Sequence, residues 1–72
     1  VLFNVYPNPA SGLLTVDTNR EVDQLNIHDL MGRVVLTSSN KNTISVDGLK
    51  AGYYYLAVSA EGKLGVQSIM VK

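Results

Sequence analysis

Seven short apolar runs, separated by turn residues, are the feature that most constrains how this chain folds. Within most runs apolar and polar residues alternate, which is the period of a strand with one buried face, and helical spacing is absent. Turn signals recur about every 8–12 residues, as in a small antiparallel sandwich. We therefore expect strands at 2–6, 12–17, 23–29, 33–37, 43–47, 53–59 and 65–71.

The same alternation predicts which face of each strand points into the core. For 33–37 the inward face is ambiguous between Val35 and the pair Val34 and Leu36. For the other six strands the expected inward residues are Phe3, Val5, Leu14, Val16, Leu25, Ile27, Ile44, Val46, Tyr54, Leu56, Val58, Ile69 and Val71.

Two glycine turns are expected to join neighbouring strands. "DLMG" (29–32) follows the third run, and "AEGK" (60–63) separates the last two as a tight hairpin. Gly32 and Gly62 stand where a positive φ is needed.

The segment "PNPA" interrupts an otherwise strand-rich beginning. Proline has no backbone N–H and a fixed φ, so Pro7 and Pro9 end the first strand. We expect them to form a stiff, extended corner that carries the chain from one sheet to the other.

Length and composition set further bounds. The 72 residues are 46% hydrophobic and 17% charged, which is enough for one small domain, spanning 1–72, and too apolar for disorder. Six basic and six acidic residues are scattered, so no patch for nucleic acid is expected. Disulfides and thiolate sites are excluded because cysteine is absent. The chain opens in mid-pattern at Val1, which suggests a piece of a longer precursor.

No catalytic, cofactor or metal site is expected. The single histidine, His28, precedes Asp29, and neighbouring residues on a strand point to opposite faces, so they cannot form a catalytic pair. "DTNREVD" (17–23) comes nearest to a calcium loop, but Arg20 interrupts its oxygen ligands. We predict that the chain is not an enzyme.

Two surfaces raise questions of binding. Tyr53 and Tyr55 are expected on one exposed face, where they could stack on sugar rings, or could simply be half-buried strand formers. The last run carries its only charge at Lys72 and would pair with another chain if it lies at a sheet edge. An edge-paired or strand-swapped homodimer is therefore also considered.

Four motifs in order resemble the C-terminal sorting domains of the type IX (Por) secretion system of Bacteroidota, type A. They are "YPNPA", "DLMGRVV", "LKAGYYYLAV" and a final apolar strand that ends in lysine. The resemblance covers essentially the whole chain and implies a seven-stranded immunoglobulin-like sandwich. It places the family's motif residues at Pro7, Asn8, Pro9, Gly32, Arg33, Gly52, Tyr54, Ile69, Met70, Val71 and Lys72.

The resemblance implies that the chain is a C-terminal secretion signal. Such a domain follows an N-terminal cargo domain through the periplasm and is recognised at the outer membrane by the type IX translocon and its shuttle. A sortase-like cysteine protease then typically removes it and attaches the cargo to lipopolysaccharide, leaving the cargo secreted or at the cell surface. We hypothesise that Pro7–Pro9 and the segment 66–72 together form the recognised surface.

Two alternatives remain open. The chain could be a carbohydrate-binding accessory module of a secreted hydrolase, with Tyr53 and Tyr55 as the stacking platform. It could instead be a structural immunoglobulin-like spacer, which would tolerate loss of its last residues.

Overall fold

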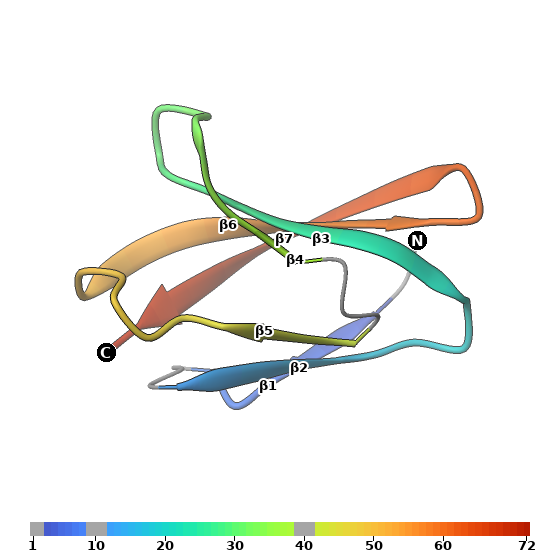
Figure 1. Cartoon of the computed structure of the whole chain (residues 1–72), viewed down its shortest axis with the longest axis horizontal. Helices are drawn as coiled ribbons and strands as arrows, with labels where there is room; N and C mark the ends of the chain where they lie inside the picture. Colours follow the sequence, from blue (N-terminus) through green and yellow to red (C-terminus); the bar gives the residue numbers. More distant parts are fainter. Residues whose placement is uncertain (1–2, 9–11, 39–41) are drawn as a thin grey trace.

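The chain folds into two antiparallel sheets that face each other as layers (Figure 1). The computed structural model describes residues 3–8, 12–38 and 42–72, and these ranges hold strands and turns without a helix. The strand order is β1-β2-β5 in one sheet and β4-β3-β6-β7 in the other. The strands are β1 (Asn4–Tyr6), β2 (Leu13–Asp17), β3 (Val22–His28), β4 (Val34–Ser38), β5 (Thr43–Ser45), β6 (Gly52–Ala60) and β7 (Lys63–Val71). The predicted seven-stranded, immunoglobulin-like sandwich is confirmed.

The core lies between the two layers, where the alternation predicted it. Ten of the thirteen residues expected to point inward are buried, while Phe3, Val5 and Tyr54 are partly buried and pack against them. Val22, Ala57 and Ala60 are also buried, although the alternation did not single them out. Val22 is missing from the predicted core because β3 begins one residue earlier than the predicted third strand, 23–29.

The strand β4 resolves the ambiguity in its inward face. Leu36 packs against the core, whereas Val34 and Val35 are exposed. The register between β3 and β4 shifts between Ile27 and His28, so a strict alternation does not hold along β4.

The hairpin of β6 and β7 is the longest pairing of the fold. Nine residue pairs run without a register shift from Gly52 and Val71 to Ala60 and Lys63. The two turn residues, Glu61 and Gly62, have φ of 53° and 77°, which is the geometry of a tight hairpin turn. Gly32, in the turn between β3 and β4, has φ of 86°. Both glycine predictions are confirmed.

The prediction that the proline segment connects the two sheets is wrong. It ends β1 as expected, but β1 pairs with β2 in the same sheet, with Val5 opposite Val16. The chain crosses between sheets later, between β2 and β3. Alternation indicates which face of a strand is buried and not which strand lies beside it, so the sequence did not distinguish the two connections. Within the described part of the segment, the Tyr6–Pro7 peptide bond is cis.

Candidate recognition surface

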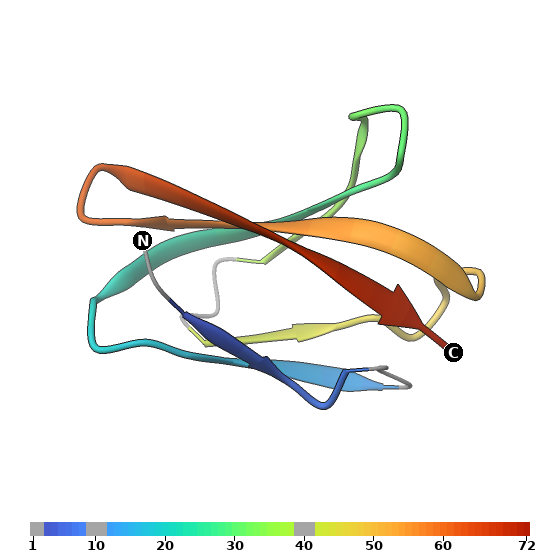
Figure 2. The ribbon, with the colours of Figure 1, turned by 180° about the vertical axis from the view of Figure 1, so that it is seen from behind.

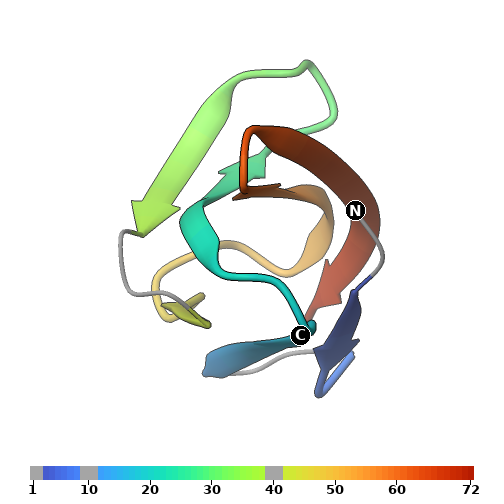
Figure 3. The same ribbon diagram turned by 90° about the vertical axis from the view of Figure 1, so that its right-hand side faces the viewer.

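The segment that follows β1 meets the end of β7 at one edge of the molecule. The Asn8 Oδ1 atom accepts a hydrogen bond of 3.0 Å from the backbone N–H of Met70, 62 residues away in the sequence. Seen from behind and from the side, the end of β7 approaches the layer that contains β1 (Figures 2 and 3). The motif between the prolines therefore contacts the terminal strand.

The hairpin geometry explains why the Met70 N–H is available. In a two-residue hairpin the residues that flank the turn, here Ala60 and Lys63, exchange hydrogen bonds, and every second pair beyond them does so too. Residues 63, 65, 67, 69 and 71 thus bond to β6. Residues 64, 66, 68 and 70 point their N–H and C=O groups to the open edge, and Asn8 satisfies the last of these donors.

The terminal motif, residues 69–72, has two buried and two exposed side chains. Ile69 and Val71 are 1% and 2% exposed and belong to the hydrophobic core, whereas Met70 is 37% exposed and Lys72 is exposed. Alternate residues of a strand point to opposite faces, so only Met70 and Lys72 are available to a partner in the folded domain.

The family's glycine–aromatic motif, Gly52 and Tyr54, lies directly opposite the terminal motif. Gly52 pairs with Val71, and Tyr54 pairs with Ile69. Gly52 has a φ of 151°, which residues with a side chain rarely adopt.

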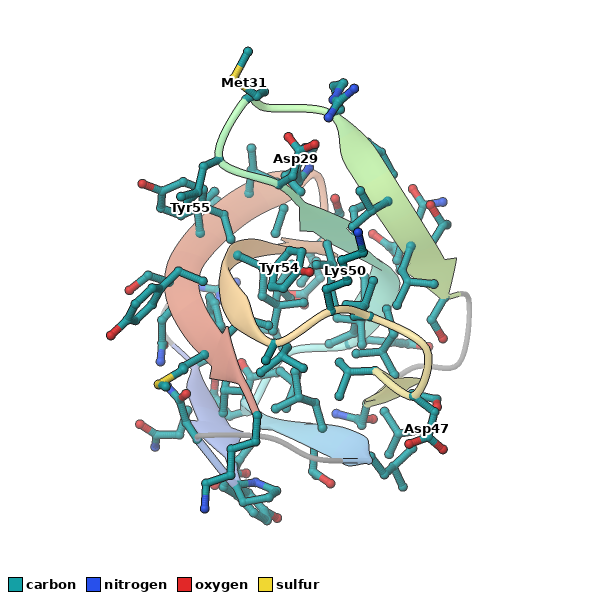
Figure 4. The ribbon with its side chains drawn as sticks, turned by 90° about the vertical axis from the view of Figure 1, so that its left-hand side faces the viewer. Asp29, Met31, Asp47, Lys50, Tyr54 and Tyr55 are labelled. Carbon is teal, nitrogen blue, oxygen red and sulfur yellow. The ribbon has the colours of Figure 1, made fainter. Side chains whose placement is uncertain are left out.

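Tyr54 points inward and its hydroxyl donates a hydrogen bond of 2.7 Å to the Lys50 carbonyl oxygen. Figure 4 shows Tyr54 beside Lys50 inside the loop, and Tyr55 on the outside of the sheet. Tyr54 therefore anchors the segment before β6, and its side chain is only partly exposed.

A residue that the motif left out, Tyr53, lies beside Met70 on the outer face. The two are cross-strand partners, and Tyr53 is 62% exposed. We call the exposed set Pro7, Asn8, Tyr53, Met70 and Lys72 the terminal patch. The sequence had indicated that Tyr53 is exposed, but only the register shows its contact with the terminal motif. Pro9 lies outside the described residues.

Gly32 and Arg33 do not join the terminal patch. They lie in the turn between β3 and β4, and β4 is the edge strand opposite β7 (Figure 3). Arg33 closes this turn, because its Nε donates to Asp29 Oδ2 at 2.8 Å and its N–H donates to Asp29 Oδ1 at 3.0 Å. The Met31 N–H also donates to Oδ1, at 2.9 Å.

These contacts set the electrostatics of the turn. The backbone N–H of Arg33 lowers the pKa of Asp29 most, and the Arg33 guanidinium and the Met31 N–H lower this pKa further. In Figure 4 Asp29 lies at the base of the turn and Met31 at its tip. The roles of Gly32 and Arg33 in the structure are thus local to this turn.

The described residues bring no set of metal-binding groups together. Within 3–8, 12–38 and 42–72, no three His, Cys, Asp or Glu side chains are placed to share a metal ion. His28 Nδ1 lies 3.2 Å from the Gly32 carbonyl oxygen. Arg20, which interrupts the possible calcium loop, forms an ion pair of 3.1 Å with Glu61. Those same ranges contain no helix of the length and apolarity needed to cross a membrane.

The outer face of the four-stranded sheet is partly apolar around Tyr55. Tyr55, 43% exposed, borders a shallow hollow of about 450 Å³, whose floor is Ala57 and whose rim includes Asn26 and His28. Leu64 and Val66 of β7 close its other side. The hollow offers one aromatic ring and two polar side chains to a ligand.

Comparison with known families identifies the chain. The family model of the secretion system C-terminal sorting domain matches residues 4–72. The chain belongs to this family. A search of the curated proteins finds no match. As a type IX sorting domain, it acts as a C-terminal signal for secretion, which implies interaction with the type IX machinery and export to the cell surface or the medium. The family consists of sorting signals and is not an enzyme family.

Proposed function

We propose that residues 1–72 form a single domain at the end of a larger exported protein and that the type IX translocon reads it through the terminal patch. The observation that supports this proposal is the hydrogen bond between Asn8 and Met70, because it unites the proline motif and the terminal motif on one surface. Gly52 and Tyr54 contribute indirectly, by holding the strand that lies opposite Val71 and Ile69.

The route that we propose follows the family pattern of type A domains in Bacteroidota. A cargo domain precedes the sorting domain and is carried with it through the periplasm. An outer-membrane shuttle and a sortase-like cysteine protease then act on the pair, and the protease exchanges the sorting domain for a lipopolysaccharide anchor. The sorting domain needs no cofactor for this role, because it is read by its shape.

The test must separate recognition from folding. Removing "IMVK" would remove Ile69 and Val71 from the core, so loss of export after this truncation would not identify the recognised residues. The informative variant changes the exposed residues alone, as Met70→Ser with Lys72→Ser. Leu64→Ser is the matched control, because Leu64 is exposed on the same face of β7 and lies outside the patch.

Each variant is fused behind a signal peptide, a fluorescent reporter and a linker in a bacterium that has the type IX system. Surface and medium fluorescence measures export, and resistance to limited proteolysis confirms that each domain is folded. We expect the patch variant to stay in the periplasm while Leu64→Ser is exported. Normal export of a folded patch variant would exclude this surface as the address.

A second candidate function is carbohydrate binding on the outer face, favoured by the exposed rings of Tyr53 and Tyr55 and the adjacent hollow. It predicts affinity for a polysaccharide that is lost in Tyr53→Ala. A structural spacer would show neither this affinity nor any loss of export in the patch variant.

A further inference from the structure

Strand β7 is the one long open edge among the described strands. β1 and β5, the edges of the smaller sheet, have three residues each, and β4 has five residues and a register shift. β7 has nine residues paired regularly with β6 on one side only. An edge strand is ordinarily protected by charge, proline or a bulge.

Such protection is confined to the two ends of β7. Lys63 and Lys72 flank a run of uncharged residues, and Asn8 covers only the N–H of Met70. Within the described ranges, the N–H and C=O groups of Leu64, Val66 and Ser68 face the edge without a strand beside them. Three consecutive outward-pointing residues are therefore open to pairing.

We propose that these residues pair with the same residues of a second copy of the chain, antiparallel and centred on Val66. In this register Val66 lies opposite Val66, and Leu64 lies opposite Ser68 on both sides. The three pairs exchange two hydrogen bonds each, as hydrogen-bonded antiparallel pairs do. The two four-stranded sheets become one continuous sheet.

The position of Asn8 selects this register over its neighbour. An antiparallel pairing centred on Gln67 would place Leu64 opposite Met70 and would need the Met70 N–H, which already donates to Asn8. Centring on Val66 uses only backbone groups that remain available.

Charge favours the second copy as the occupant. In the register centred on Val66, Lys72 of one copy extends past the hairpin turn of the other, beside the exposed Glu61, which also pairs with Arg20 of its own copy. The two Lys63 residues are kept apart, because each lies opposite Ile69 of the other copy. The uncharged strand thus meets an uncharged strand, and its terminal lysine meets an acid.

The proposal is tested by sedimentation of the purified 72-residue chain over a range of concentrations. Val66 is 57% exposed, so Val66→Lys and Val66→Glu leave the core intact. We expect the unchanged chain to dimerise, each variant alone to associate at least tenfold more weakly, and their equimolar mixture to regain the dimer. The rescue follows because residue 66 faces residue 66 at the two-fold axis.

Two further variants fix the mode of association. Val35→Lys places the same charge on exposed β4 at the opposite edge and should leave the dimer unchanged. Val66→Pro removes the edge N–H without touching the bonds to β6, so it abolishes strand pairing but not face-to-face stacking. A chain that stays monomeric at millimolar concentration overturns the proposal, and so does a dimer that survives Val66→Pro in a folded variant. The test needs no secretion machinery, so its outcome is independent of the proposed address function.

Discussion

Replacing Ile69 by alanine should destabilise the domain far more than changing its neighbour Met70. Ile69 is 1% exposed and lies in the cluster between the sheets, so the shorter side chain leaves a cavity. Substitutions of this kind cost about 2–5 kcal/mol. A domain of this size rarely has more than about 3–5 kcal/mol of stability in total. Ile69→Ala should therefore remove half or more of the stability of the domain.

Two graded variants calibrate this expectation. Ile69→Val removes one methyl group and should cost about 0.5–1.5 kcal/mol. Met70→Gln keeps the length of an exposed side chain and should change the stability by less than about 1 kcal/mol.

Urea unfolding, followed by far-ultraviolet circular dichroism, measures the stability of all three variants. With a slope of about 1 kcal/mol/M, each kcal/mol of lost stability lowers the urea midpoint by roughly 1 M. The reasoning fails if Ile69→Ala unfolds at the same urea concentration as Met70→Gln. That result would mean that the terminal strand is not part of the core, and truncations of "IMVK" could then be interpreted as changes in recognition alone.

Three other changes follow from individual contacts. Asn8→Ala should leave the Met70 N–H without its acceptor and speed its hydrogen exchange, measured by NMR, while amides paired to β6 keep their rates. Tyr54→Phe loses one hydrogen bond to a backbone carbonyl and should cost about 0.5–1.5 kcal/mol in urea unfolding, whereas an unchanged midpoint would contradict an anchoring role. The pKa of Asp29 is lowered in the folded chain, so its stabilising effect is present above the unfolded pKa of about 3.9 and is lost as the pH falls below it. Asp29→Asn should thus lower the free energy of unfolding near neutral pH and make this free energy decrease less steeply as the pH falls. An equally steep decrease in the variant would show that other carboxylates are responsible for the loss of stability in acid.

The strands and their buried faces could be predicted because alternation is a local signal. Leu25 and Ile27, or Ile44 and Val46, reveal their orientation within a few residues. The inward face of β4 could not be predicted, since the register shift next to His28 depends on how β3 and β4 pair. The predicted path of the chain after Pro7 was wrong for a related reason. Proline predicts where a strand ends, but it does not predict which strand the following strand will pair with.

The resemblance pointed to the residues of the family motifs but not to the direction in which each side chain points. Tyr54, Ile69 and Val71 are part of the family motifs, yet each is turned toward the interior. Tyr53 belongs to the surface although the motif does not include it. Alternation could have separated these residues once the hairpin register was known. No local pattern could have linked Asn8 to Met70, because nothing near either residue marks the other.

The contact between Asn8 and Met70 joins opposite ends of the chain, so it exists only after both sheets have formed and packed. A peptide copied from either end would carry its motif without the other half of the surface. If the translocon recognises the joined surface, an unfolded sorting domain carries no secretion signal. Peptides copied from the two ends, even when mixed, should then not compete with the folded domain for the translocon. Export would then include its own check on folding: a precursor whose tail has not closed would wait in the periplasm without any separate quality-control factor.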